Sequence, residues 1–286
     1  MQKFCLISVL SILLLLVAAQ ILNARESAEL VVNTWSDDCC ASCDALPGFN
    51  NMVGHWFNEV RDGSHGSRAF DDYSKWRIDG HFTQDLLTDG TYEQYAADSS
   101  WIDYVDVAIV ALHGTRRNSN HHWGARVRSQ NINDECIADP DEMEVGDYNN
   151  ENLVLVSCYS VNKNYFSHWS EWKQMFGGMQ ALNGFHGKAW LADWLHDDYE
   201  NFADDGFDVP LKTAFMDNLY ESNAFNDGGT IVDQCPVTVS AGSSSTEARS
   251  YRDNYYYYTW GSDPSGNSNW ARWGVIGCDP GGEGAY

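Results

Sequence analysis

Two short segments decide the fold class: DVAIVALHG at positions 106–114 and NLVLVSCYS at positions 152–160. A nearly continuous apolar run covers most of each segment: Val105–Leu112 overlaps the first, and Leu153–Ser157 lies within the second. Runs that are apolar on both faces are typical of central strands in a parallel sheet, whereas the strands of a two-sheet sandwich alternate apolar and polar residues. The two segments therefore predict an α/β fold with a mostly parallel central sheet.

Strand and helix patterns alternate around these segments, as in a doubly wound sheet. The spacing of apolar residues predicts further strands at 30–35 and 179–185, and helices at 46–60, 166–176, 190–202 and 208–219. The tail from about residue 229 is rich in Gly, Ser, Tyr and Trp. We expect one or two short strands plus loops there, tied back by Cys235 and Cys278. Its aromatic residues could stack on ligands, although strand packing explains them equally well.

The N-terminus has the layout of a secretory signal peptide. A positive charge at Lys3 precedes an apolar run that ends at Ala19, and this run is too short for a membrane anchor. We expect residues 1–24 to be a signal peptide, cleaved after Ala19 or Ala24. Residues 25–286 are then expected to form a single domain with a Tyr/Trp-rich C-terminal extension from about 229, and the mature protein to be secreted and extracellular.

The chain is strongly acidic, with a formal net charge of -24. Such a charge repels nucleic acids and anionic membrane surfaces, so neither is an expected partner. Calcium is a candidate ligand of the acidic clusters at 139–144 and 197–208, because it prefers several oxygen ligands. Neither cluster has the spacing of a calcium-loop motif, and a solvated surface is the other interpretation. We expect no required cofactor, and the metal content and the oligomeric state are left open.

Seven cysteines remain after loss of the signal peptide: Cys39, Cys40, Cys43, Cys136, Cys158, Cys235 and Cys278. In an oxidising compartment six of them can form three disulfides, which leaves one thiol over. The C-x-x-C motif within this set has no second pair and no histidine at metal-ligand spacing, so structural disulfides are expected there.

The leftover thiol is expected at the sheet edge where ligands bind. His113-Gly114 ends one buried strand and Cys158 ends the next, 45 positions later. In open parallel sheets, ligands bind beyond the carboxyl ends of the strands. If the two strands are neighbours, an imidazole and a thiol face one crevice, which is what a nucleophilic cysteine and its base require. The alternative is that Cys158 is a buried or disulfide-bonded structural cysteine.

The two quoted segments resemble the paired signature of caspase-like and gingipain-like (clan CD) cysteine peptidases. That resemblance implies a caspase-like three-layer α/β sandwich, with His113 as general acid/base, Cys158 as nucleophile and Gly114 as a contributor to the oxyanion hole. Residues 103–106, 146–147 and 176–185 extend the match, so that 103–194 resembles a family of secreted caspase-like domains of uncharacterised function. Unlike in caspases, Tyr159 and Ser160 follow the cysteine, so no caspase-type preference for aspartate is implied.

The functional hypothesis is a secreted cysteine peptidase that hydrolyses peptide bonds in a protein or peptide substrate. The alternative is a catalytically inactive secreted binding protein on the same scaffold, with a protein or carbohydrate ligand.

Overall fold

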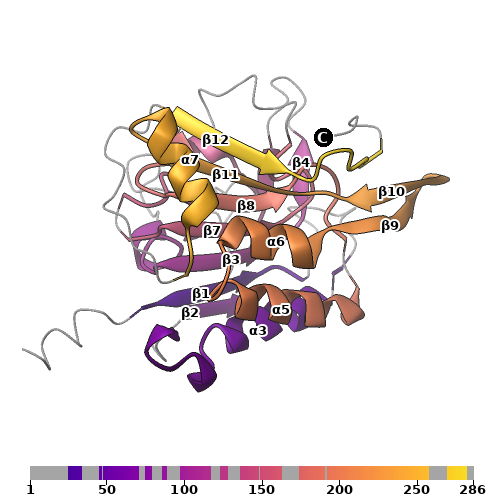
Figure 1. Ribbon diagram of the computed structural model, residues 1–286. Helices are drawn as coiled ribbons and strands as arrows, with labels where there is room; N and C mark the ends of the chain where they lie inside the picture. The colour runs from indigo at the N-terminus through magenta and orange to yellow at the C-terminus, as the bar shows by residue number, and fades with distance from the viewer. Residues whose placement is uncertain are drawn as a thin grey trace, which may run out of the picture.

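One seven-stranded sheet joins segments from both ends of the described chain (Figure 1). The structure, a computed structural model, describes residues 25–33, 45–46, 48–70, 75–78, 86–88, 97–116, 123–127, 136–147, 149–162, 174–190, 192–257 and 269–281. The predicted signal peptide, its two cleavage positions and the C-x-x-C segment lie outside these residues. The single-domain prediction for 25–286 stays a prediction.

The sheet has the strand order β12-β11-β8-β7-β3-β1-β2. The five strands from β2 to β8 pair in parallel, whereas β11 pairs antiparallel with both β8 and β12. The bounds are β1 Ser27–Val31, β2 Lys75–Ile78, β3 Val107–Ala111, β7 Asn152–Val156, β8 Ala181–Phe185, β11 Pro236–Gly242 and β12 Asn269–Gly274. The predicted mostly parallel α/β sheet, including its strands near 105–112, 153–157 and 179–185, is confirmed.

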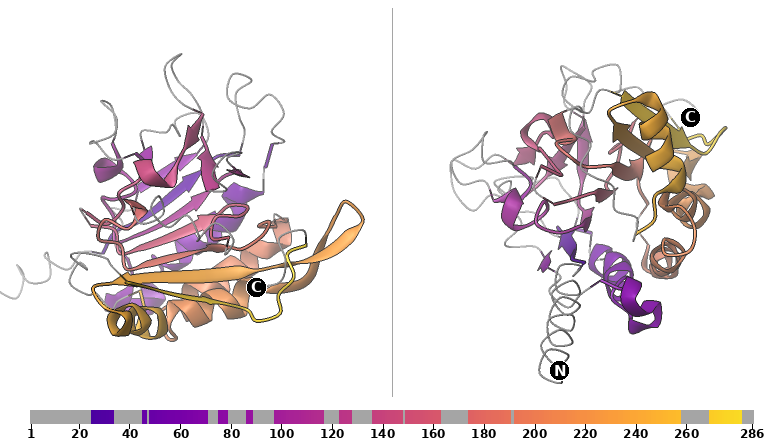
Figure 2. Two further views of the ribbon diagram at one scale, coloured as in Figure 1. Left: turned by 90° about the horizontal axis from the view of Figure 1, so that it is seen from above. Right: turned by 60° about the vertical axis from the view of Figure 1, so that its left-hand side comes forward.

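Four helices lie on one face of this sheet: α3 Phe49–Glu59, α5 His196–Asp205, α6 Leu211–Leu219 and α7 Ser245–Asn254 (Figures 1 and 2). The helices α3, α5 and α6 bury apolar side chains against alternate residues of β3 and β7, such as Ile109, Ala111, Val154 and Val156. This face forms one of the two hydrophobic cores. No helix among the described residues is long and apolar enough to cross a membrane.

The opposite face is covered by a small sheet of β4 (Gly114–Arg116), β5 (Trp123–Arg126) and β6 (Ile137–Ala138) (Figure 2). Trp123 of β5 packs there with Val110 and Leu112. These two side chains point to the face opposite to that of Ile109 and Ala111. In the described part of the chain, this outer layer contains short 3-10 turns but no long helix. The predicted helix at 166–176 falls mostly outside the described residues.

The tail contributes more regular structure than predicted. Strands β11 and β12 extend the central sheet, and β9 (Glu221–Asp227) and β10 (Thr230–Gln234) form a hairpin that projects beside it (Figure 1). A disulfide joins Cys235 to Cys278, which provides the predicted tie. Tyr255 and Tyr257 are buried in the helix-side core, so these two aromatic residues serve packing.

Strand β1 begins at Ser27, three residues before its predicted start at residue 30. The strand also ends at Val31, ahead of the predicted end at residue 35, and Glu29, just before the predicted start, lies inside it. The Glu29 side chain is nevertheless buried, with only 6% of the residue exposed. Its partner in the neighbouring strand is Ile109, which packs in the helix-side core. A carboxylate therefore occupies a position where the sheet otherwise carries apolar residues.

Burial changes the protonation of this carboxyl. The Oε1 atom of Glu29 has no hydrogen-bond partner. Removal from water disfavours the charged form, and burial raises the pKa of Glu29 to about 7. Burial also raises the pKa of Asp106, to about 6, although a hydrogen bond from the Glu26 backbone N–H opposes this shift. Both carboxyls hold their protons more tightly in the folded chain than in the unfolded chain.

We predict that folding stability falls as pH rises from about 4.5 through about 7, and that Glu29→Gln removes a large part of this fall. The protonated Glu29 stabilises the folded state below pH 4.5, and this contribution is lost once the folded protein ionises. The pKa shift corresponds to about 3 kcal/mol. Urea unfolding of the parent and the variant between pH 4.5 and 8 measures it. A free-energy difference between them that does not change with pH would contradict the prediction.

Candidate active site

The register between β3 and β7 places the two predicted catalytic residues at one level of the sheet. Val107 pairs with Asn152 and Ala111 with Val156, so that the offset is 45 at each pair. The Leu112 N–H donates to the Val156 carbonyl (3.2 Å), which continues the contact beyond the paired strands. The same offset of 45 separates His113 from Cys158. Both residues follow directly at the carboxyl edge of two adjacent parallel strands.

The alternation of side chains places both residues on the same face. Ala111 and Val156 point into the helix-side core. Because side chains alternate along a strand, His113 and Cys158, two positions further on, are expected on that side as well. The intervening Ser157 points the other way, since its Oγ accepts a hydrogen bond from Trp123 Nε1 (3.0 Å) in the opposite core. The sequence prediction that these two strands are neighbours is confirmed.

Gly114 lies directly against the backbone of Cys158. A Cβ atom at Gly114 would lie 2.0 Å from the Cys158 carbonyl oxygen and 2.7 Å from Trp123 Nε1, closer than any real side chain could come. The adjacent His113 carbonyl accepts a hydrogen bond from the Arg126 N–H (2.9 Å). Hydrogen-bonded pairs alternate in antiparallel strands, so the next pair, Gly114 with Ala125, is a non-bonded pair. The Gly114 N–H therefore lies outside the β4–β5 ladder.

Cys158 is a free, partly buried thiol. It begins a tight turn in which Tyr159 has a φ of 63°, a left-handed conformation that is uncommon for a residue with a side chain. The Tyr159 N–H donates to the Gly187 carbonyl (2.6 Å). The hydroxyl of Ser160 donates to the Leu155 carbonyl (3.2 Å). These bonds fix the backbone of the turn that presents the sulfur.

Burial is the main influence on the thiol and raises the pKa of Cys158. Three weaker influences lower it: hydrogen bonding to the Ala189 backbone, the positive charge of Lys188, and hydrogen bonding to the backbone of Cys158 itself. Lys188 Nζ itself pairs with Asp227 Oδ1 on the β9–β10 hairpin (2.6 Å), and the Asp227 charge acts on the thiol in the opposite direction. At neutral pH the sulfur is thus mainly protonated, and its ionisation requires a base.

The sequence predicted strand β8, but the residues that follow it were not considered as part of the site. The segment GFHGK at 184–188 repeats the pattern of a strand that ends in His-Gly. Its histidine, His186, is fully buried, and its carbonyl accepts a hydrogen bond from Asn162 Nδ2 (2.6 Å). The residue that affects the thiol is Lys188, two positions later, because its positive charge lowers the pKa of Cys158.

The cysteine predictions can be compared with the structure in part. Cys235 and Cys278 are bonded to each other, Cys136 is also disulfide-bonded, and Cys158 is free as predicted. The alternative in which Cys158 itself forms a disulfide is wrong. The predicted total of three disulfides involves cysteines outside the described residues and stays a prediction.

One residue of the acidic cluster at 197–208, Asp204, belongs to a group of potential metal-binding side chains. In the described part of the chain, this group brings three side chains within 4.8 Å of one another, namely Glu59, His65 and Asp204. His65 Nε2 lies 3.1 Å from Glu59 Oε1 and 3.8 Å from Asp204 Oδ1. A nitrogen ligand suits calcium poorly, because that ion prefers oxygen. The group is well explained as a buried histidine with acidic partners.

Comparison with known families identifies the chain. A family described as "Domain of unknown function (DUF6345)" matches residues 34–275, which include His113, Gly114, Cys158 and Lys188. The chain belongs to the DUF6345 family.

The DUF6345 chain was also compared with curated proteins and with solved structures. No curated protein matches it. Among solved structures, it is similar to a secreted C11 cysteine protease from Bacteroides thetaiotaomicron in complex with an irreversible peptide inhibitor. The two are 10% identical with a TM-score of 0.39, and the match covers 76% of the DUF6345 chain and 66% of the protease chain.

We predict that Gly114→Ala lowers the free energy of unfolding of the DUF6345 chain by about 1 to 3 kcal/mol, the usual cost of overpacking. The new methyl group would overlap the Cys158 carbonyl and the Trp123 ring, so a strand end must move. Gly63→Ala is the matched control, because a Cβ at Gly63 would meet nothing within 4 Å. Urea unfolding measures both variants. Equal stabilities for the two would show that Gly114 is not the tight contact described here.

We predict that Lys188→Gln and Asp227→Asn change the reactivity of Cys158 in opposite directions. Loss of the lysine charge raises the pKa of the thiol further, so that alkylation by iodoacetamide at pH 8 slows several-fold. Loss of the aspartate charge lowers the pKa and accelerates alkylation. Mass spectrometry of the Cys158 peptide over time gives the rates. A change in the same direction in both variants would indicate altered access to the sulfur instead of altered charge.

Proposed function

We propose that this DUF6345 protein is a secreted cysteine peptidase that hydrolyses peptide bonds with a dyad of His113 and Cys158. The observation that carries the proposal is the register of β3 and β7, in which each residue pairs with the residue 45 positions later in the chain. His113 and Cys158 have this same separation, at the carboxyl edge of the two strands. A thiol and an imidazole at that edge are the two groups that acyl transfer through sulfur needs.

The protonation of the sulfur assigns a role to the imidazole. Because burial raises the pKa of Cys158, little thiolate is present at neutral pH before substrate binds. His113 accepts the thiol proton as the sulfur attacks the carbonyl carbon of the peptide. The imidazolium then protonates the leaving amine as the C–N bond breaks. Water, deprotonated by the same imidazole, hydrolyses the thioester and releases the free thiol.

The negative oxygen of the tetrahedral intermediate needs hydrogen-bond donors. The Gly114 N–H lies outside the β4–β5 ladder and borders the Cys158 backbone, so it is free to donate there. The missing side chain at Gly114 is a requirement of this contact. Lys188 and its partner Asp227 are assigned no role in bond breaking, and they adjust the charge around the sulfur.

Secretion is part of the proposal and is supported by sequence and by disulfide bonding. The signal-like N-terminus would direct the chain out of the cytosol, and Cys235–Cys278 is a bond of the kind that forms in oxidising compartments. A protein or peptide substrate follows from the proposed chemistry. The strong negative charge argues against nucleic acid and anionic membranes as partners.

A binding protein on the same scaffold is the second candidate function. One observation favours it: Trp194, 51% exposed, packs with Trp190 beside the Ala189 carbonyl that contacts the sulfur. Exposed aromatic rings at such a place could hold a ligand without any catalysis. Loss of the thiol would leave this binding intact.

The decisive test is cleavage of a peptide library by the secreted protein, followed by mass spectrometry. We predict that Cys158→Ala abolishes cleavage and that His113→Ala lowers its rate by about 10²–10⁴-fold, the usual contribution of a general base. His196→Gln, a change at a partly exposed histidine on α5, is the control and should retain full activity.

Two results would contradict the peptidase proposal. One is cleavage that persists in both Cys158→Ala and His113→Ala. The other is a parent protein that cuts no peptide and whose thiol alkylates at the same rate with and without His113. Ligand binding that survives Cys158→Ala, combined with the second result, would establish the binding function instead.

A further inference from the structure

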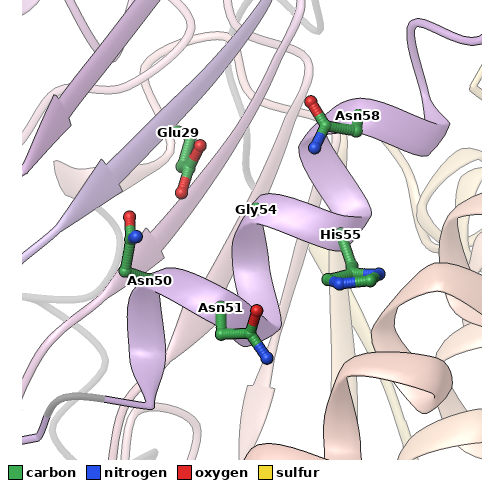
Figure 3. A pocket seen from close by; sticks show the side chains of 6 residues that line it. All are labelled: Glu29, Asn50, Asn51, Gly54, His55 and Asn58. Atoms are coloured by element: carbon green, nitrogen blue, oxygen red, sulfur yellow. The ribbon is translucent and has the colours of Figure 1, made fainter.

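A cavity of about 290 Å³ lies between strand β1 and helix α3, on the helix side of the sheet (Figure 3). Six residues line it: Glu29, Asn50, Asn51, Gly54, His55 and Asn58. It shares no lining residue with the proposed active site. At this size it falls at the lower end of the range for small-molecule pockets, roughly 300–1,000 Å³.

The sequence of α3 creates the space. The helix buries Met52, Val53 and Trp56 against the sheet, while Asn50, Gly54 and Asn58 recur every four residues along the side nearest Glu29 (Figure 3). Glycine in the middle of a helix costs about 1 kcal/mol relative to alanine. At position 54 its missing side chain leaves room, because even a Cβ atom there would lie only 3.7 Å from Glu29 Oε1.

The carboxylate of Glu29 borders the cavity without a positively charged partner. Its residue is 6% exposed and its Oε1 has no hydrogen-bond partner, although the side chain borders the cavity (Figure 3). A buried carboxylate is costly unless a positive group pairs with it. No lysine or arginine lines the cavity. The one basic ring there, His55, already places Nδ1 2.7 Å from Glu200 Oε2 on α5.

We propose that the cavity binds the primary ammonium group of a small organic amine. The ammonium group supplies the missing positive charge to Glu29, and its N–H donors match the carboxylate together with the amide oxygen of Asn50, which lies beside Glu29 in Figure 3. The half-open cavity leaves room for a short carbon chain beside α3. The proposal is independent of the peptidase chemistry.

A metal ion fits this cavity less well. Calcium takes six to eight oxygen ligands, usually with several carboxylates, and only one carboxylate lines the cavity. An ammonium group needs one anionic acceptor and a few neutral ones. Amide side chains suit it because each can turn its oxygen toward a donor.

Binding to the secreted protein at pH 8 tests the proposal, with n-butylamine as the cationic probe and n-butanol as the neutral probe of equal length. Isothermal titration or NMR chemical-shift titration gives the affinities. We predict saturable binding of n-butylamine, at least tenfold tighter than n-butanol. Glu29→Gln weakens amine binding at least tenfold. Glu59→Gln, which removes the same charge from the end of α3 at a carboxylate paired with His65, leaves it unchanged.

A second variant separates loss of charge from loss of space. Gly54→Leu keeps Glu29 but fills the cavity, and it should also abolish amine binding. Equal binding of n-butylamine and n-butanol, or equal effects of Glu29→Gln and Glu59→Gln, would overturn the proposal. Calcium chloride that binds in competition with the amine and is lost in Glu29→Gln would overturn it in favour of a metal site.

Discussion

Strands β3 and β7 are buried on both faces, so an alternation of apolar and polar side chains cannot fix their register. Polar contacts at their amino ends fix it instead. The Asp106 carbonyl accepts the N–H groups of both Glu151 (3.0 Å) and Asn152 (3.2 Å), at the point where the second strand begins. The five paired positions carry this alignment along the sheet. At the carboxyl edge it brings His113 level with Cys158, and a slip of one residue would turn one of them to the other core.

The same principle aligns the next strands. Asn183 in β8 donates from Nδ2 to Asn152 Oδ1 (3.0 Å), and its own Oδ1 accepts a hydrogen bond from Thr238 Oγ1 in β11 (2.6 Å). This short chain of buried polar groups spans three neighbouring strands, β7, β8 and β11. Asp103 adds a bond to the Gly146 N–H ahead of β7 (2.6 Å). Asn183 thus has partners in both neighbouring strands, whereas Nδ2 of Asn152 has no hydrogen-bond partner.

The sequence allowed the central sheet and the relation of His113 to Cys158 to be predicted, because two long apolar runs and their spacing are local signals. It placed β1 wrongly, because Glu29 looks like a break in the strand until α3 is seen to cover it. It missed Lys188, whose position beside the sulfur depends on Asp227 of a distant hairpin. Such contacts arise between segments far apart in the chain, and no local pattern encodes them. The catalytic roles stay predictions.

The segment that carries Lys188 contacts the tail at two points. The Cys235 carbonyl accepts a hydrogen bond from the His186 N–H at the end of β8 (2.9 Å). Pro280 packs against Gly187, so closely that a Cβ atom at the glycine would lie 2.3 Å from the proline ring. The Cys235–Cys278 bond links these two clamping segments covalently. Since such a bond forms in oxidising surroundings, the covalent brace beside Lys188 depends on the redox state of the compartment in which the chain folds. The surroundings of Cys158 are in this way coupled to the oxidation of two cysteines far from it in the chain.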